Sequence, residues 1–139
     1  MTRLPLDAAT VLQALSLELE HEPVDADQVV SGAPTTGIAA LAELDDIEIG
    51  VWEITPGIVT DVEVDEVFVV LSGHATLRRE DGSESELVAG TVGRLEDGEE
   101  TEWEVHLQQK LAWSTVEGMS TSTHPKARIM ERTVRPGME

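Results

Sequence analysis

Short apolar segments alternate with glycine-containing turns over residues 50–116, and this pattern limits the fold more than any other feature of the chain. Within the stretch, apolar residues form short runs, as at 67–71, or recur at every second position, as at Trp103, Val105 and Leu107, and pairs such as Asp81-Gly82 or Asp97-Gly98 separate these segments. Alternation with a period of two is typical of strands that bury one face, and pairs of this kind favour tight turns. Many short strands joined by glycine turns predict a small all-β barrel or sandwich.

The alternation predicts strands at residues 38–44, 47–55, 66–71, 75–79, 84–88, 101–107 and 111–116. Turns are expected at Asp45-Asp46, Pro56-Gly57, Ser72-Gly73, Asp81-Gly82, Ala89-Gly90 and Asp97-Gly98. Before the strands, Asp7 can cap a short helix over residues 8–15. Alternating leucines around residues 15–19 fit either a strand or a longer helix, and residues 21–34 predict an irregular arm.

The chain has 139 residues, a length that predicts a single domain, 1–139. We expect a barrel core at about 36–116, an N-terminal arm at 1–35 and a C-terminal tail at 117–139. The absence of cysteine excludes disulfides, thiolate metal sites and cysteine nucleophiles. No apolar run is long enough to cross a bilayer, and the N-terminal residues do not match a signal peptide, so we expect a cytoplasmic protein.

The formal net charge of -19 argues against binding to nucleic acid or to an anionic membrane surface. The charge is uneven, because residues 118–139 carry four basic side chains against two acidic ones. The acidity can serve solubility alone. Alternatively, the basic tail can dock on the acidic body or on a neighbouring subunit.

Three motifs in order identify a family. They are G-V-W-E-I-T-P-G at 50–57, D-E-V-F-V-V-L-S-G at 65–73 and G-T-V-G-R-L-E-D-G at 90–98, followed by Trp103 and Lys110. Together they resemble the cupins, and within them the EutQ-like group, which includes ureidoglycine aminohydrolase-like proteins. The resemblance implies a double-stranded β-helix, or jelly-roll barrel, with a short N-terminal helix or arm and a C-terminal tail. It also implies a homodimer.

The resemblance implies that Glu66 occupies the glutamate position of the metal-binding cupin motif. The histidine positions fall on Thr60 and Val62, or with a longer spacing on Val59 and Asp61, and the second-motif histidine falls on Thr101. A zinc or iron centre normally needs three or more protein ligands and favours imidazole. We therefore expect no metal and no cofactor. Asp61, Glu63 and Asp65 alternate with valines, which predicts a solvated strand face.

The four histidines supply no replacement centre in the sequence. His21 lies in the predicted arm, His74 follows a turn, His106 lies on the strand face opposite Trp103, and His124 is in the tail. No two of them have the i, i+4 spacing of helical metal ligands. We expect each imidazole to be exposed or hydrogen-bonded once.

Alternation places Glu66 with Phe68 on one strand face, and Thr101 with Trp103 on another, and the motif match directs both faces into the barrel. Trp52 and Glu53 lie on opposite faces of their strand. The predicted ligand-binding residues are Trp52, Glu53, Thr60, Phe68, Thr101 and Trp103. Such an interior would suit a small polar metabolite.

Glu66 and Lys110 are the candidate catalytic residues. A glutamate in a desolvated barrel, close to a lysine, could perform general acid–base chemistry without a metal. The alternative is that the two side chains form a structural ion pair or never meet.

These observations predict a small cupin barrel that binds a small polar metabolite in its central pocket, and a metal-independent metabolic enzyme of EutQ-like type is one form of this prediction. The alternatives are a non-catalytic ligand-binding or sensory cupin, and a structural cupin whose barrel is filled. Whether the chain is an enzyme stays open at this point.

Overall fold

A computed structural model describes residues 5–6 and 10–116, and it confirms an all-β architecture. The strands are β1 (Glu22–Pro23), β2 (Val29–Ser31), β3 (Thr35–Leu44), β4 (Ile47–Ile54), β5 (Gly57–Val62), β6 (Glu66–Arg79), β7 (Glu84–Leu87), β8 (Val92–Leu95) and β9 (Glu100–Val116). Two single 3-10 turns, η1 (Ala14–Ser16) and η2 (Ala26–Gln28), lie in the N-terminal region. Within the described residues, no helix is long and apolar enough to span a membrane.

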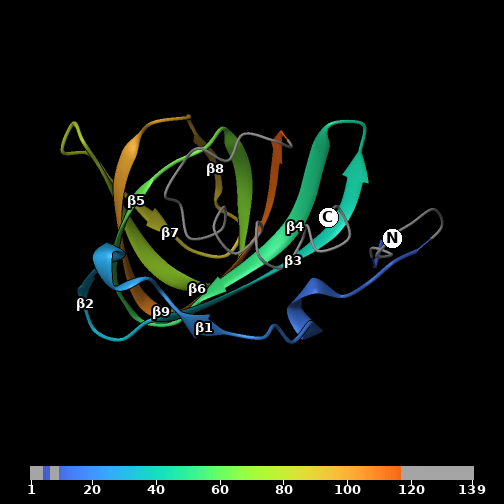
Figure 1. The fold of residues 1–139 in the computed structure, drawn as a ribbon, viewed down its shortest axis with the longest axis horizontal. Helices are drawn as coiled ribbons and strands as arrows, with labels where there is room; N and C mark the ends of the chain where they lie inside the picture. The colour runs from blue at the N-terminus through green and yellow to red at the C-terminus, as the bar shows by residue number, and fades with distance from the viewer. Residues whose placement is uncertain (1–4, 7–9, 117–139) are drawn as a thin grey trace.

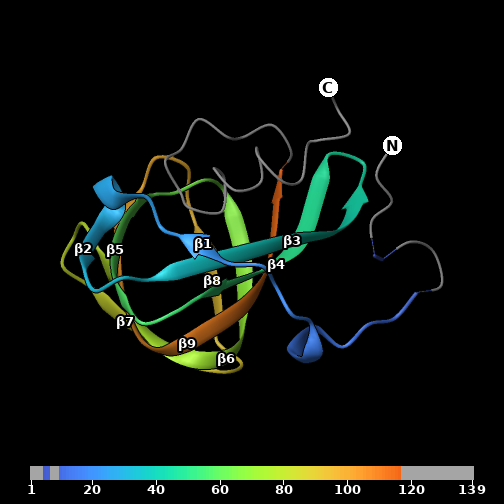
Figure 2. The same cartoon turned by 60° about the horizontal axis from the view of Figure 1, so that its bottom comes forward.

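The sheet curls into a half-barrel because its two longest strands, β6 and β9, belong to both of its halves (Figures 1 and 2). Along one edge, β9 pairs first with β5 and then with β4, while β6 lies antiparallel along its other edge. One half has the order β1-β3-β4-β9-β6-β8 and the other the order β2-β5-β9-β6-β7. We call them the β4 half and the β5 half.

The bend between the halves lies at residues 70–75 of β6, where the register with β9 shifts three times. Gly73 has a φ of 90°, and a Cβ atom there would lie 2.2 Å from the carbonyl oxygen of Gln108. Bulges bend a strand without ending its pairing. The prediction of a turn at Ser72-Gly73 is therefore wrong. Residues 66–79 form one bent strand, and so do residues 100–116.

Inward-facing side chains of both halves form one apolar core. The inner faces predicted for Glu66 with Phe68, and for Thr101 with Trp103, are confirmed by the burial of all four residues. In β6 the apolar core residues are Phe68 and Val70 before the bulges and Ala75 and Leu77 after them, and Thr76 is also buried. The core consists of Val24, Ile38, Trp52, Ile54, Val59, Phe68, Val70, Ala75, Leu77, Leu87, Leu95, Trp103, Val105, Leu111 and Trp113.

The N-terminal region is less helical than the sequence predicts. Residues 10–13 have no helix, and η1 makes a single turn; residues 7–9 lie outside the described part. Helices this short are marginal without a buried apolar stripe, and no residue of η1 is buried. The expected irregular arm instead adds β1 to the edge of β3 and β2 to the edge of β5. The basic tail lies outside the described residues.

Besides β1 and β2 in the arm, the structure contains two strands of the barrel, β5 and β8, that the sequence does not predict. In β5 the inward positions include Asp61 as well as Val59, so the strand lacks a clean apolar face. In β8, Gly93 and Arg94 both weaken the local preference for a strand. Pairing with longer neighbours, β9 and β6, stabilises both segments.

Candidate functional site

Three of the predicted ligand-binding residues, Trp52, Phe68 and Trp103, pack against one another inside the barrel. The ring centroids of Trp52 and Trp103 are 5.6 Å apart with an edge-on angle of 80°. Those of Phe68 and Trp103 are 6.0 Å apart. All three side chains are buried in the apolar core. They therefore fill the middle of the barrel, and contacts of this kind are typical of aromatic cores.

Two acidic side chains of the β4 half are buried at the end of the barrel where β6 begins. Glu48 of β4, Thr115 of β9 and Glu66 of β6 are register partners and form one row across three strands. Both carboxylates belong to buried residues. Glu66 thus lies inside the barrel, on the face that its motif position implies.

The β5 half brings two further carboxylates to the same end. Asp61 pairs with Thr101 of β9, and Glu63 follows β5 directly. Only three positions separate Glu63 from Glu66, so their Cα atoms lie within about 11 Å of each other. We call Glu48, Asp61, Glu63 and Glu66 the acidic end; each is at most 5% exposed.

Glu63 connects the acidic end to the aromatic core. Its Oε2 atom accepts a hydrogen bond from the Thr101 hydroxyl at 2.6 Å and another from the Trp103 indole N–H at 3.1 Å. The backbone of Glu63 pairs with that of Gly98 and Glu99. These bonds hold the side chain inward and compensate part of the cost of burying it.

The expectation that Asp61, Glu63 and Asp65 form a solvated strand face is wrong for the first two residues. Alternation along the chain shows which residues share a face, but it does not show which face is covered. The β5 half turns the acidic face inward, so Asp61 and Glu63 are buried. Asp65 is partly exposed and accepts a hydrogen bond from the backbone N–H of Asp97 at 3.0 Å.

The acidic end does not fit a histidine-rich metal centre. Val59 and Asp61 face inward, whereas Thr60 is exposed and its hydroxyl donates to the carbonyl oxygen of Gln28, so the longer motif spacing gives the barrel-facing positions. With Thr101 and Glu66, these positions offer carboxylates and a hydroxyl, while iron and zinc centres favour imidazole. The described histidines, His21, His74 and His106, lie outside the barrel.

Two open clefts reach the acidic end. The larger has a volume of about 400 Å³ and is lined by Asp61 and Thr101 together with Gln28, Arg78 and Arg79. The smaller, of about 220 Å³, is lined by Glu66 and Thr115 with Asp65 and Arg94. Each arginine of these clefts is bound to a carboxylate of the protein.

Lys110 and Glu53 lie on the outer side of the β4 half, beneath the N-terminal arm. The ammonium group of Lys110 donates to the carbonyl oxygens of Ala14 and Leu17, each at 2.6 Å, and lies 3.4 Å from Glu53 Oε2. Glu53 Oε1 is 2.7 Å from His21 Nε2. We call Lys110, Glu53 and His21 the arm clamp, because together they fasten residues 14–21 to the sheet.

The structure does not bring Glu66 and Lys110 together. Glu66 is opposite Thr115 in the register of β6 and β9, whereas Lys110 is opposite Ser72. Six residues of strand separate the two positions, a distance of about 20 Å. Moreover, Glu66 faces the barrel interior and Lys110 faces the arm. The general acid–base pair considered from the sequence is therefore not assembled.

An ion-pair ladder centred on Arg78 covers the outer face of β6, β7 and β9. The guanidinium donates to Glu84 at 2.7 Å, to Glu102 at 3.0 Å and to Glu104 at 2.6 Å. These hydrogen bonds, led by that to Glu104, raise the pKa of Arg78 above its ordinary value. In return, the Arg78 guanidinium lowers the pKa of Glu104.

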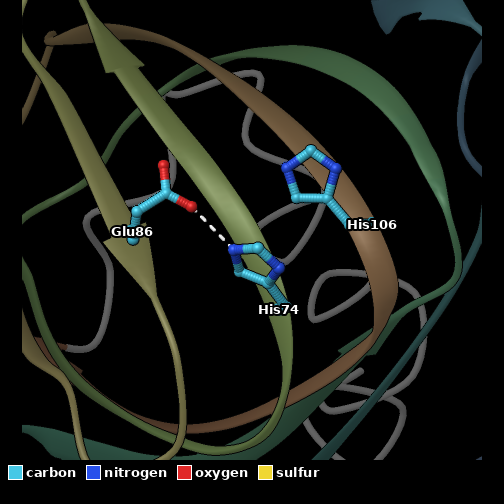
Figure 3. A group of neighbouring side chains, drawn as sticks. All are labelled: His74, Glu86 and His106. Carbon is cyan, nitrogen blue, oxygen red and sulfur yellow. Dashed lines mark hydrogen bonds and ion pairs between the residues drawn. The ribbon is translucent and has the colours of Figure 1, made fainter.

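Next to this ladder, His74, Glu86 and His106 converge (Figure 3). His74 Nε2 is 2.6 Å from Glu86 Oε1, and the two imidazole centroids are 4.6 Å apart. The hydroxyl of Thr76 lies 3.0 Å from Glu86 Oε2 and 2.9 Å from His106 Nε2. The hydrogen bond from His74, followed by that from Thr76, lowers the pKa of Glu86.

Sequence reasoning missed this group because it treated each histidine alone. One signal was available: the hairpin at residues 80–83 pairs Thr76 with Glu86, and alternation puts His74 on the same side as Thr76. The position of His106 depends on a bulge between β6 and β9, which local sequence does not reveal.

The bent antiparallel half-barrel, the inward Glu66 and the glycine-turn motifs define a protein of the cupin class. A family model for the EutQ-like cupin domain matches residues 41–110, just over half of the chain. The chain therefore belongs to the EutQ-like cupin domain family, which confirms the resemblance seen in its motifs. No curated protein matches the sequence.

Solved structures agree with this fold. A protein of unknown function from Pseudomonas syringae pv. tomato, of the DUF861 family, is 24% identical with a TM-score of 0.65 over 76% of this chain. The match spans 46% of that protein, so less than half of its length is represented here. At this identity the likeness shows the fold alone.

Two further structures are similar at lower identity. The EutQ protein of Clostridium difficile is 14% identical, with a TM-score of 0.54 over 63% of this chain and 66% of its own. A cupin superfamily protein of Desulfitobacterium hafniense is 19% identical, with a TM-score of 0.55 over 84% of this chain and 99% of its own. These likenesses also concern the fold alone.

Proposed function

We propose that the chain is a EutQ-like cupin that binds, at its acidic end, a small polar metabolite rich in hydrogen-bond donors, such as an amine or a polyol. The observation that carries the proposal is the burial of four carboxylates, Glu48, Asp61, Glu63 and Glu66, at one end of the barrel. Burying an ionised carboxylate costs several kcal/mol before compensation. If stability alone had been selected, apolar residues at these positions would make the barrel more stable.

The chemistry of the site favours donors and cations over anions. Carboxylates and the Thr101 hydroxyl supply oxygen acceptors, and the arginines of the larger cleft are engaged by the protein's own acids: Arg78 by Glu102, and Arg79 by Glu99. The net charge of -19 also raises the local concentration of cations. A carboxylate or phosphate ligand would meet repulsion at the acidic end.

Glu63 supports the binding site from within the protein: it is fully buried and lines neither cleft, but it accepts a hydrogen bond from Thr101, which lines the larger cleft. Hydrogen bonds from Thr101 and Trp103 hold its carboxylate in one position. Trp103 is in turn held by its ring contacts with Trp52 and Phe68. Thr101, which Glu63 supports in this way, is preorganised for recognition, because little rotamer entropy is lost on binding.

A binding or sensory role has better support than catalysis. The candidate base Glu66 has no contact with Lys110, whose ammonium group is engaged by carbonyl oxygens of the arm. The competing possibility is a structural cupin with a filled barrel, and the aromatic core formed by Trp52, Phe68 and Trp103 favours it. The two possibilities differ in whether any small molecule stabilises the fold.

A thermal-shift screen separates them. Wild-type protein and the Glu63→Gln and Asp61→Asn variants are screened against amines, polyols, amino acids and carboxylic acids. We expect amines or polyols to raise the melting temperature of the wild type, since a ligand that binds only the native state stabilises it by mass action. The shift should disappear in both variants.

The matched control is Glu53→Gln, which alters a buried carboxylate of the arm clamp, outside the acidic end. This variant should keep the ligand-induced shift even if its own melting temperature falls. Circular dichroism verifies that each variant is folded. A screen without hits in any class favours the filled barrel, and hits confined to carboxylic acids contradict the proposed ligand chemistry.

The homodimer and the cytoplasmic location stay predictions. Support for a homodimer comes from two apolar side chains on the outer face of the β4 half, Val67 and Val92, which are 47% and 68% exposed. Sedimentation velocity of the wild type and of Val67→Lys tests it. A wild-type monomer would exclude the homodimer.

A further inference from the structure

We propose that His74, Glu86 and His106 form a binding site for a divalent transition-metal ion on the outer face of the barrel (Figure 3). One ligand atom of each residue lies within 4.8 Å of those of the other two. The side chains come from three neighbouring strands, β6, β7 and β9. The site is independent of the acidic end, which lies on the inner side of the same sheet.

A register irregularity brings the two imidazoles together. His74 pairs with Leu107, whereas the next residue of β6, Ala75, pairs with Val105. His106 is therefore the extra residue of a bulge in β9. Bulges redirect side chains, and here both His106 and Leu107 are exposed. The β6–β7 hairpin then brings Glu86 opposite Thr76. Thr76 is two residues after His74 and therefore lies on the same face of β6.

Two imidazoles and a carboxylate are a donor set that zinc uses at sites with an open coordination position. In a tetrahedral zinc site with bonds of about 2.0 Å, ligand atoms are about 3.3 Å apart, closer than the present limit of 4.8 Å. The side chains of His74, Glu86 and His106 are 38%, 57% and 36% exposed, so small rotations can close this gap. Solvent can fill the remaining position.

The surrounding residues supply the second shell that a metal-bound histidine requires. The Nδ1 atom of His106 faces the carboxylate of Glu104 at 3.9 Å, which leaves Nε2 directed at the cluster. Arg78 in turn holds Glu104. Thr76 contacts both Glu86 and His106. A carboxylate behind a ligating imidazole orients the ring and raises its basicity.

Isothermal titration calorimetry with Zn²⁺ alone tests the proposal, using the full chain after treatment with a chelator. We expect one zinc ion per chain. The variants His74→Asn, His106→Asn and Glu86→Gln should each bind at least about tenfold more weakly, since even second-shell changes have effects of this size. Thr76→Val should weaken binding by about tenfold without removing a ligand.

The matched controls are His21→Asn, in the arm clamp, and His124→Asn, in the tail. Both should bind zinc as the wild type does. Because His74 and His106 are partly exposed, their variants should remain folded by circular dichroism. Unchanged binding in a His74→Asn/His106→Asn double variant, or equal losses in the controls, would overturn the proposal.

A measurement on the wild type gives a second test that does not depend on the zinc affinities of the variants. In histidine side-chain NMR spectra, substoichiometric Zn²⁺ should perturb two imidazole resonances, assigned to His74 and His106 by the variants above. Perturbation of all four histidines to the same degree, or of none, would exclude this site. Zinc should also raise the melting temperature, since it would connect β6, β7 and β9 in the native state only.

Discussion

The two faces of β6 and β9 carry different chemistry. Inward, the strands present Glu66, Thr101 and Trp103, which contribute to the acidic end and the aromatic core. Outward, they present two imidazoles and the Arg78 ladder. Metal-binding cupins usually direct histidines into the barrel. Here β6 directs the Glu66 carboxylate inward, while β6 and β9 direct the imidazoles of His74 and His106 outward, so the two faces of the same strands carry different ionisable groups.

The two faces differ because one is shielded from water and the other is exposed to it. Inside the barrel a carboxylate is tolerated only with nearby hydrogen bonds, as Glu63 has with Thr101 and Trp103. Outside, water solvates the side chains, and individual ion pairs contribute little to stability. Substitutions in the buried aromatic core should therefore reduce stability strongly, and substitutions of exposed side chains on the outer face should reduce it little.

The largest effect is expected from Trp103→Ala. The substitution leaves a cavity against Trp52 and Phe68 and removes a hydrogen bond to Glu63, so the free energy of unfolding should fall by about 3–5 kcal/mol. Urea denaturation measures it. Leu107→Ala on the same strand is the control; this side chain is exposed, and its loss should cost no more than about 0.5 kcal/mol. Equal costs would remove the contrast between the faces.

Lys110→Met should reduce the unfolding free energy by about 3 kcal/mol, because it removes the ammonium group beside the buried carboxylate of Glu53 and, among the described residues, leaves only His21 in contact with it. Lys110 is the outward residue that the arm covers, so it behaves as an interior charge. The arm, held through Ala14 and Leu17, should also become sensitive to limited proteolysis. A Lys110→Met/Glu53→Gln double variant should lose less than the sum of the single variants. An additive loss would contradict the pairing.

Gly73→Ala should cost about 2 kcal/mol or more, because the added Cβ meets the backbone of Gln108 at a positive φ. It should also weaken zinc binding, since the bend immediately precedes His74. Gly82→Ala is the control: its φ is similarly positive, but nothing lies within 4 Å, so about 1 kcal/mol is expected. Similar losses in the two variants would show that the close approach at Gly73 is unimportant.

Arg78→Met should have the smallest effect on stability, because the ion pairs of the ladder are partly exposed. The melting temperature should fall slightly at low ionic strength. The difference from wild type should shrink at about 1 M salt, where the screening length is about 3 Å. A loss that persists at high salt would show that the aliphatic part of Arg78, rather than its charge, stabilises the sheet.

Local features of the sequence predict a good part of the fold. The strands at 38–44 and 47–55 correspond to β3 and β4, and the turn at Asp81-Gly82 joins β6 to β7. That turn is stabilised within itself: Asp81 accepts a hydrogen bond from the backbone N–H of Ser83, and its hydrogen bonds with Ser83 lower the pKa of Asp81. Interactions between residues this close in the sequence can be predicted without a structure.

The candidate sites were less predictable, because each depends on contacts between distant segments. Lys110 appeared to be a barrel residue, yet carbonyl groups more than 90 residues away bind it. The sequence predicts that Asp61 and Glu63 are solvated, yet Glu63 is inside the barrel and accepts hydrogen bonds from Thr101 and Trp103. Alternation alone does not show which of the two faces of a strand is buried, because that depends on where the neighbouring strands lie.

The sequence by itself determined the cupin class, the all-β fold, the inward position of Glu66 and the lack of histidines at the interior metal positions. These properties follow from residue type and from spacing along one strand. Only the tertiary structure decided that four carboxylates share the acidic end, that Lys110 serves the arm, and that His74, Glu86 and His106 meet. The reason is that the curvature of β6 and β9 and the register between them, with its three shifts, set which side chains of distant segments come within contact.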